Sequence, residues 1–154
     1  MAVEEVDLYK AVGMAVMSSQ LFERVFVFAA KFAIKQPDAR TVEDIVHVNS
    51  ATAFRQPIKA LLNEISGTAA TQGLEDRISV LIEKRHRVVH RLVDETPWPG
   101  DVTPEQRQHV YQLCMDVISE SKLLTSELAD LLCKWMENIP ELREALESFD
   151  QRPL

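Results

Sequence analysis

The chain has 154 residues, of which 46% are hydrophobic and only four are glycine, so it is long enough for one ordinary domain with a substantial core. Its formal net charge of -7 at pH 7 repels nucleic acid at long range, so any nucleic-acid binding would depend on a local basic patch. The two cysteines, Cys114 and Cys133, are too few and too far apart for a disulfide framework or a structural zinc site, and we expect both to be reduced, buried thiols.

The N-terminal region has no basic segment followed by an apolar run, and no apolar stretch reaches the roughly 18 residues that a membrane helix needs. We therefore expect a cytoplasmic protein that does not enter a membrane. No repeat, low-complexity tract or linker divides the sequence. This predicts a single domain over residues 1–154.

Apolar residues recur at three- and four-residue steps, which predicts an all-α fold, a bundle of four main helices plus short helices. The first helix is expected from about Val3 to Lys35, where Gln36 and Pro37 end it. Its segment LFERVFVFAAKFA is apolar on nearly every side. Because a four-helix monomer could not cover all of these sides, we expect a homodimer that buries much of this helix and part of the third long helix.

Two short helices are expected next. Thr41 and Asp44 fit a capping box that opens one of them, and the segment FRQPIKALLNEISG supplies another that ends at Gly67. A third long helix is expected from about Gly73 to Asp94.

The last long helix has a clear start signal. In the sequence TPEQ, Thr103 is the expected N-cap, Pro104 takes the first helical position and Gln106 completes a capping box. This helix is expected to run to about Asn138. The segment PELREALESF then predicts a short amphipathic helix at the end of the chain.

The third long helix carries a dense basic segment, KRHRVVHR, in an otherwise acidic chain. Its apolar face is expected to gather Leu74, Ile78, Leu81, Ile82, Val88, Val89 and Leu92. Arg85 stands near the middle of this stripe, where a leucine would be expected. A guanidinium against a core is costly unless it is paired or opens to water, so Arg85 needs a carboxylate partner, a bend in the helix, or a path to the rim of the core.

Polar residues interrupt the first helix in a corresponding way. The segment SSQLFER introduces Ser19, Gln20 and Glu23 among apolar neighbours, where they could face Arg85. Glu23 is the simplest partner for a half-buried Arg85, since a bidentate pair satisfies both charges. Gln20 would support the same site. The alternative is that Glu23 is exposed and pairs with a neighbouring lysine.

The residues R-H-R-V-V-H, from Arg85 to His90, resemble the signature of the HEPN superfamily (higher eukaryotes and prokaryotes nucleotide-binding domains). In this signature a histidine follows an arginine after four to six residues, and the residue after the arginine is often polar, as His86 is here. The resemblance covers the motif, the chain length and the all-helical layout. A second match, Arg40 and His47, crosses a helix N-cap, carries two acids and has no basic neighbours, and we reject it.

The resemblance implies metal-independent cleavage of RNA, with no cofactor, in a cleft to which each of two subunits contributes the motif. We assign His90 the acid-base role, Arg85 the stabilisation of charge on the phosphate, and His86 an orienting or supplementary role. The candidates for binding the substrate backbone are Lys84, Arg87 and Arg91. For small stand-alone members, the resemblance implies a toxin or phage-defence component held in check by an antitoxin-like protein partner.

On a regular helix, Arg85 and His90 are roughly 140° apart around the axis, so they need a second subunit, or a local tightening of the helix, to act together. Two other interpretations stay open. One is a HEPN-like module that binds RNA or nucleotide without cleaving it, and the other is an all-α structural or adaptor dimer. A zinc site at His86 and His90 lacks a third ligand, so no metal site is expected.

Overall fold

The computed structural model of the chain describes residues 2–45, 55–97 and 100–150. Every regular element in these residues is a helix, and no strand occurs among them, which confirms the all-α prediction. The fold divides into two compact units. One contains Met1–Glu23 and Gly73–Thr125, and the other contains Arg24–Gln72 and Ser126–Leu154.

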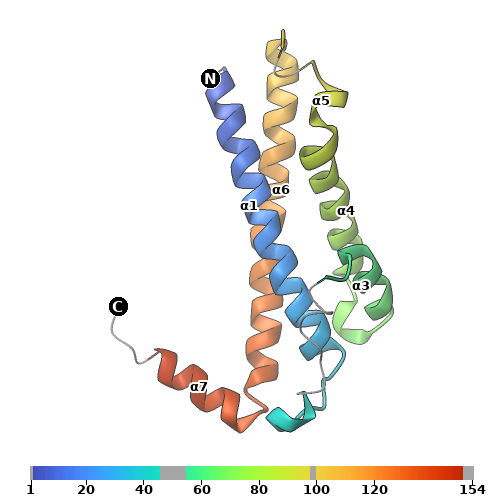
Figure 1. Ribbon diagram of the computed structural model, residues 1–154, viewed down its shortest axis with the longest axis vertical. Helices are drawn as coiled ribbons and strands as arrows, with labels where there is room; N and C mark the ends of the chain where they lie inside the picture. The colour runs from blue at the N-terminus through green and yellow to red at the C-terminus, as the bar shows by residue number, and fades with distance from the viewer. Residues whose placement is uncertain (1, 46–54, 98–99, 151–154) are drawn as a thin grey trace. The chain divides into compact units, whose positions relative to one another are not determined.

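Three helical segments build the first unit. They are the first part of α1 (Glu5–Phe28), α4 (Glu75–His86) with its continuation, and the first part of α6 (Pro104–Met136). α1 and α6 run in the same direction and α4 runs in the opposite one (Figure 1). Two ion pairs join α4 to α6, between Arg77 and Glu120 and between Lys84 and Asp116. The later residue of α4 pairs with the earlier residue of α6, as antiparallel packing requires.

The core of the first unit consists of apolar side chains at helical spacing. Its larger members are Leu8, Phe22, Ile78, Leu81, Val88, Leu92, Val110, Leu113, Val117, Ile118 and Leu124. Burying a side chain of this size contributes about 1.5–3 kcal/mol, so the core fixes how each helix is rotated about its axis. On the α4 side, the buried positions leave a gap of one turn between Leu81 and Val88, and Arg85 occupies that gap.

The start of α6 agrees with the prediction from the sequence. The backbone N–H of Thr103 donates to Oε1 of Gln106 at 2.9 Å, and the backbone N–H of Gln106 donates to Oγ1 of Thr103 at 3.2 Å. Pro104 is the first residue of the helix. This capping box satisfies two backbone donors that the helix itself leaves without a partner.

The second unit contains the end of α1 with the π-helical η1 (Ala29–Ile34), the end of α6, and α7 (Pro140–Asp150), together with the short helices η2 (Val42–Asp44), α3 (Ile58–Ile65) and η3 (Ala69–Thr71). Trp135 is buried among Ala33, Ala39 and Ile139, and its indole N–H donates to the carbonyl of Gln36 at 2.7 Å. This hydrogen bond satisfies the one polar group of a large buried aromatic side chain.

The predicted local signals of the second unit are confirmed where the structure describes them. Thr41 and Asp44 form a capping box, which opens the 3-10 helix η2. Gly67 follows α3 with a φ of +80°, a left-handed conformation that glycine adopts without strain.

The apolar run LFERVFVFAAKFA is mostly covered within the chain, contrary to our expectation that it would need a second subunit. Its buried members are Phe22, Phe26, Val27, Ala29, Ala30 and Ala33. Most of the exposed large apolar side chains of α1 lie before or at the start of this run, and they are Val6, Tyr9, Met14, Met17 and Leu21, while Phe28 is a further one inside the run. Any need for a covering partner therefore comes from this exposed stripe and not from the run as a whole.

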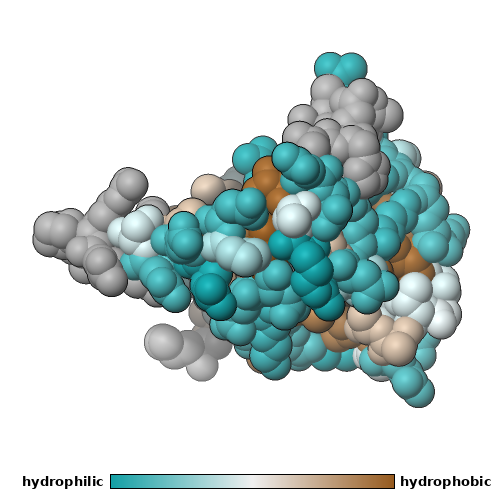
Figure 2. Space-filling view, turned by 90° about the horizontal axis from the view of Figure 1, so that it is seen from below, coloured by the Kyte–Doolittle hydropathy of each residue, from teal (hydrophilic) through white to brown (hydrophobic). Residues whose placement is uncertain are grey.

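The helical segment Glu5–Ile34 is long and apolar enough to cross a membrane, which the sequence had not led us to expect. Length and composition do not by themselves distinguish such a helix from a core helix of a soluble protein. On the face seen in Figure 2, most of the surface is hydrophilic and the hydrophobic residues form separate patches.

Candidate functional site

Arg85 lies against Glu23 in the first unit. Its Nε atom is 2.9 Å from Oε1 of Glu23, and the two side chains are 30% and 23% exposed. This confirms the expectation that Arg85 would be partly buried beside a carboxylate. Burial raises the pKa of Glu23, and the nearby charge of Arg85 acts in the opposite direction.

The contact is an ion pair rather than a well-formed hydrogen bond. Although Nε of Arg85 is within 2.9 Å of the carboxylate, this buried nitrogen has no hydrogen-bond partner among the described residues. The two observations agree if the N–H bond points away from the oxygen, because distance alone defines an ion pair whereas a hydrogen bond also needs alignment. The charge of Arg85 is thus compensated while one of its donors is left without an acceptor.

The backbone changes its geometry inside the motif. α4 ends at His86, the π-helix η4 covers Arg87–Arg91, and α5 (Leu92–Glu95) follows. Backbone hydrogen bonds in a π-helix join residues five apart, so one turn takes more residues than the roughly 3.6 of an α-helix. Arg85 and His90 therefore lie nearer to one face than the roughly 140° of a regular α-helix would allow. The helix widens at the motif, and our suggestion that it might tighten there was wrong.

His86 and His90 stand next to each other across this change. Their ring centroids are 5.0 Å apart and the ring planes are tilted by 47°. His86 is half-buried and His90 is exposed. The structure thus places two imidazoles side by side, one and five residues after Arg85, and the outer one can meet a substrate from solution.

The basic residues around the motif are largely engaged with carboxylates. Nζ of Lys84 is 3.1 Å from Oδ2 of Asp116, and Nε of Arg87 is 3.1 Å and 3.3 Å from the two carboxylate oxygens of Glu95. Arg91 is exposed and has no ion-pair partner within the described ranges. A phosphate would therefore compete with two carboxylates for Lys84 and Arg87.

These acidic partners were not found from the sequence. Asp116 lies on α6, far from Lys84 along the chain, and no local spacing connects the two residues. A hydrogen bond from Gln112 and, less strongly, the contact with Lys84 lower the pKa of Asp116. Glu95 lies eight residues after Arg87, beyond the three- and four-residue spacings that predict an ion pair along a helix.

The polar residues of α1 and α6 divide into buried and exposed ones. Gln20 is exposed and makes no hydrogen bond with the described residues, so the structure does not bring it to the pair of Glu23 and Arg85. Ser19 is fully buried, and its hydroxyl donates to the carbonyl of Val16 at 2.9 Å. Ser121 on α6 is also fully buried, and its Oγ has no partner in the described part of the chain. The sequence signal that could have identified Ser121 was a serine at one of the inward-facing positions of α6.

The rejected match at Arg40 gives no competing site. The side chain of Arg40 is exposed, and its Nη1 donates to the carbonyls of Ala39 and Pro37 at 2.9 Å and 3.3 Å. The guanidinium is therefore occupied by the local backbone. His47 lies outside the described residues.

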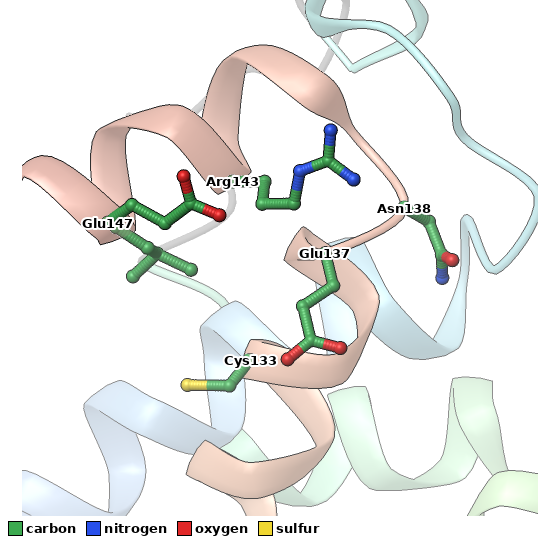
Figure 3. A pocket seen from close by; sticks show the side chains of 6 residues that line it. Cys133, Glu137, Asn138, Arg143 and Glu147 are labelled. Carbon is green, nitrogen blue, oxygen red and sulfur yellow. The ribbon is translucent and has the colours of Figure 1, made fainter.

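A separate hollow of about 610 Å³ lies between the end of α6 and α7. Figure 3 shows Cys133 on α6, Glu137 directly after the end of α6, and Arg143 and Glu147 on α7. Cys133 is exposed, so the expectation of two buried thiols holds only for Cys114, whose pKa is raised by burial to about 11. Within the described residues, no three His, Cys, Asp or Glu side chains are placed to hold a metal ion.

Comparison of the chain with protein-family models, with curated proteins and with solved structures found no match. The candidate site is therefore characterised by the side chains that the structure places together. It combines a half-buried guanidinium, two adjacent imidazoles and two flanking cations, Lys84 and Arg87, that are paired with carboxylates.

Proposed function

We propose that this protein is a metal-independent endoribonuclease of the HEPN type, built around Arg85 and His90. One observation carries the proposal. His90, whose imidazole is exposed, lies five residues after Arg85 on a helix that changes to π geometry between them, and a carboxylate holds Arg85 at the edge of the core. A guanidinium placed at such a cost, next to an accessible acid-base group, is typical of a functional site rather than of simple packing.

The chemistry assigned to these residues is transesterification within RNA. His90 accepts the proton of a ribose 2′-hydroxyl, and the 2′-oxygen then attacks the adjacent phosphorus. The bond from phosphorus to the 5′-oxygen breaks, and the leaving oxygen takes up a proton, for which His86 is the nearest described imidazole. Arg85 stabilises the negative charge that builds on the phosphate. The products are a 2′,3′-cyclic phosphate and a 5′-hydroxyl.

Contact with the rest of the RNA is assigned to the basic side chains that flank the motif. Arg91 is available at the surface, and Lys84 and Arg87 would exchange their carboxylate partners for phosphates. Because the whole chain is acidic, this binding is expected to be local and to weaken steeply as salt is raised.

We also propose that the protein acts as a homodimer. Val89 on η4 is 38% exposed and Val93 on α5 is 64% exposed, and they lie one residue before and three residues after His90. A second copy that packs on this face about a two-fold axis would cover these side chains and bring two copies of the motif together. The exposed stripe of α1 offers further apolar surface to the same partner.

The biological setting proposed here rests on the resemblance of the motif alone. It is that of a cytoplasmic toxin or phage-defence component, restrained by an antitoxin-like protein.

A second candidate function is a HEPN-like module that binds RNA or nucleotide without cleaving it. The observation that favours it is the occupation of Lys84, Arg85 and Arg87 by carboxylates, which lowers the positive potential available to a scissile phosphate. A structural or adaptor dimer is the third candidate, in which these ion pairs would serve the fold alone.

The test is incubation of purified protein with single-stranded RNA in the presence of EDTA. The proposal expects cleavage, fragments that end in a 2′,3′-cyclic phosphate, and no cleavage of DNA of the same sequence, which lacks the 2′-hydroxyl. Intact RNA that nevertheless binds to the protein would favour the non-catalytic module. Intact RNA with no binding would favour the structural dimer.

A further inference from the structure

We propose that His86 and His90 form a binding site for one divalent transition-metal ion such as Zn²⁺, and that the bound ion inhibits the ribonuclease. The inhibitory part of this inference rests on the proposed function. The binding part does not, because it depends only on how the two imidazoles are placed.

The distance between the rings fits a shared metal ion. A zinc ion lies about 2.0–2.1 Å from each histidine nitrogen, and a ring nitrogen lies about 1 Å from the ring centre, so two imidazoles at a tetrahedral angle have centres about 5 Å apart. The centroids of His86 and His90 are 5.0 Å apart. The spacing of the two rings therefore suits a shared ion once one nitrogen of each ring is turned toward it.

The site offers two protein ligands and leaves the other positions to water. No third His, Cys, Asp or Glu of the described residues is placed to complete it. Since structural zinc sites use four protein ligands, a two-ligand site predicts weak and reversible binding, which suits regulation rather than folding.

The surrounding charges do not prevent cation binding. Arg85 and Arg87 carry positive charge near the two rings, but each of them is paired with a carboxylate, Glu23 and Glu95 respectively. Their repulsion of a divalent ion is therefore reduced at short range. Arg91, which follows His90, has no such partner among the described residues, but it is exposed, so water screens its charge.

Metal binding and acid-base catalysis compete for the same electron pair. A metal ion binds neutral imidazole through the ring nitrogen that would otherwise accept a proton. With the ion bound, His90 can neither take the proton of the 2′-hydroxyl nor return it. The ribonuclease activity is then expected not only to persist in EDTA but to rise when EDTA is added to a preparation that contains traces of zinc.

Binding is tested by titrating metal-free protein with ZnCl₂ and measuring heat by calorimetry. All proteins carry Cys133→Ser, which removes the exposed thiol as a competing ligand. We expect one ion per chain, and affinity about a hundredfold lower in His86→Ala or His90→Ala, because a chelate is reduced to a single ligand. His109→Ala alters an exposed histidine on α6 and should bind like the parent. Equal affinity in the parent and in His86→Ala would overturn the proposal, as would an absence of binding in the parent.

Inhibition is measured separately, as cleavage of RNA at increasing Zn²⁺ relative to the metal-free rate of each variant. The parent and His109→Ala should lose activity at zinc concentrations that match the measured affinity, and His86→Ala should need about a hundredfold more zinc. Binding without inhibition would refute the regulatory part alone. If the protein cleaves no RNA at all, the proposed function fails, while calorimetry still decides whether the metal site exists.

Discussion

Nε of Arg85 lies 2.9 Å from Oε1 of Glu23, with less than a third of either side chain exposed. The pair joins α4 to α1 inside the first unit, and Arg85 is the first residue of the motif. Each charge is tolerated at this partly buried position because the opposite charge is beside it. Replacing either residue therefore raises the cost of burying the charge of the other.

The apolar stripe alone predicted that Arg85→Leu would keep or raise stability, but because Glu23 is its partner, replacement of Arg85 alone should destabilise the protein. Arg85→Leu leaves the carboxylate of Glu23 mostly buried without its counter-ion, and we expect a loss of about 1–3 kcal/mol in the free energy of unfolding. The double variant Glu23→Leu with Arg85→Leu should recover most of this loss, because two apolar side chains suit the core. Urea unfolding measures both changes, with the exposed Arg91→Leu as the control. A double variant less stable than Arg85→Leu would contradict this account of the pair.

The stability of the protein should carry the signature of Glu23 in its pH dependence. Burial raises the pKa of this carboxyl, against the opposing charge of Arg85. Between the unfolded pKa and the raised folded pKa, the folded protein binds more protons than the unfolded chain. The contribution of Glu23 to the free energy of unfolding therefore falls as pH rises through this window.

Comparison with Glu23→Gln isolates this effect. As the pH is lowered from neutral through the folded pKa, the wild-type protein should gain stability relative to Glu23→Gln. Asp116, whose pKa is lowered, has the opposite slope but is present in both proteins, so it cancels. Urea unfolding at a series of pH values measures the difference. A difference that shrinks on acidification would show that the pKa of Glu23 is lowered in the folded protein.

Removal of the acidic partner of Arg87 should strengthen the binding of RNA. Glu95→Gln takes away the carboxylate that occupies this guanidinium, and we expect several-fold tighter binding at low salt. Fluorescence anisotropy with a 2′-O-methylated oligonucleotide, which has no nucleophile, measures binding without cleavage. Glu105→Gln makes the same change of net charge at an exposed site at the start of α6. Equal gains in both variants would indicate a general charge effect and no role for Arg87.

The dimer should depend on the exposed stripe of α1. Met17 is 72% exposed and Leu21 is 57% exposed, so they have little part in the packing of the monomer. We expect a dimer at micromolar concentration, and we expect Met17→Asp to shift it toward monomer without loss of helical content, because a charge would be buried in the interface. Sedimentation equilibrium with circular dichroism measures both properties. A wild-type protein that is monomeric at this concentration would refute the dimer.

The sequence predicted the helices well because their signals are local. The capping box at Thr103 and the glycine at position 67 act within one turn, and both are confirmed. The partnership of Glu23 with Arg85 was predictable for a different reason. A charge at an inward position of one helix needs an opposite charge at an inward position of another, and few residues qualify.

Other parts of the site depend on features that residue patterns do not express. No characteristic residue type marks the π-helix from Arg87 to Arg91 in the sequence. This helix nevertheless changes which side chains share a face with Arg85. The partner Asp116 follows from the packing of α4 on α6, and Glu95 is eight residues from Arg87, outside the usual spacing of helical ion pairs. The apolar run of α1 was assigned to a dimer interface because its burial depends on tertiary packing, which the sequence does not specify.

The most direct test of the central claim is RNA cleavage in EDTA by the wild-type protein, His90→Ala and His109→Ala, each purified away from any inhibitory partner. His90 and His109 are both exposed, so neither replacement should unfold the protein, which circular dichroism verifies. We predict cleavage by the wild-type protein and His109→Ala, with 2′,3′-cyclic phosphate ends, and a loss of at least about a hundredfold in His90→Ala. Equal cleavage by His90→Ala and the wild-type protein, or no cleavage by any of the three, would contradict the assignment of His90 as the acid-base group of a ribonuclease.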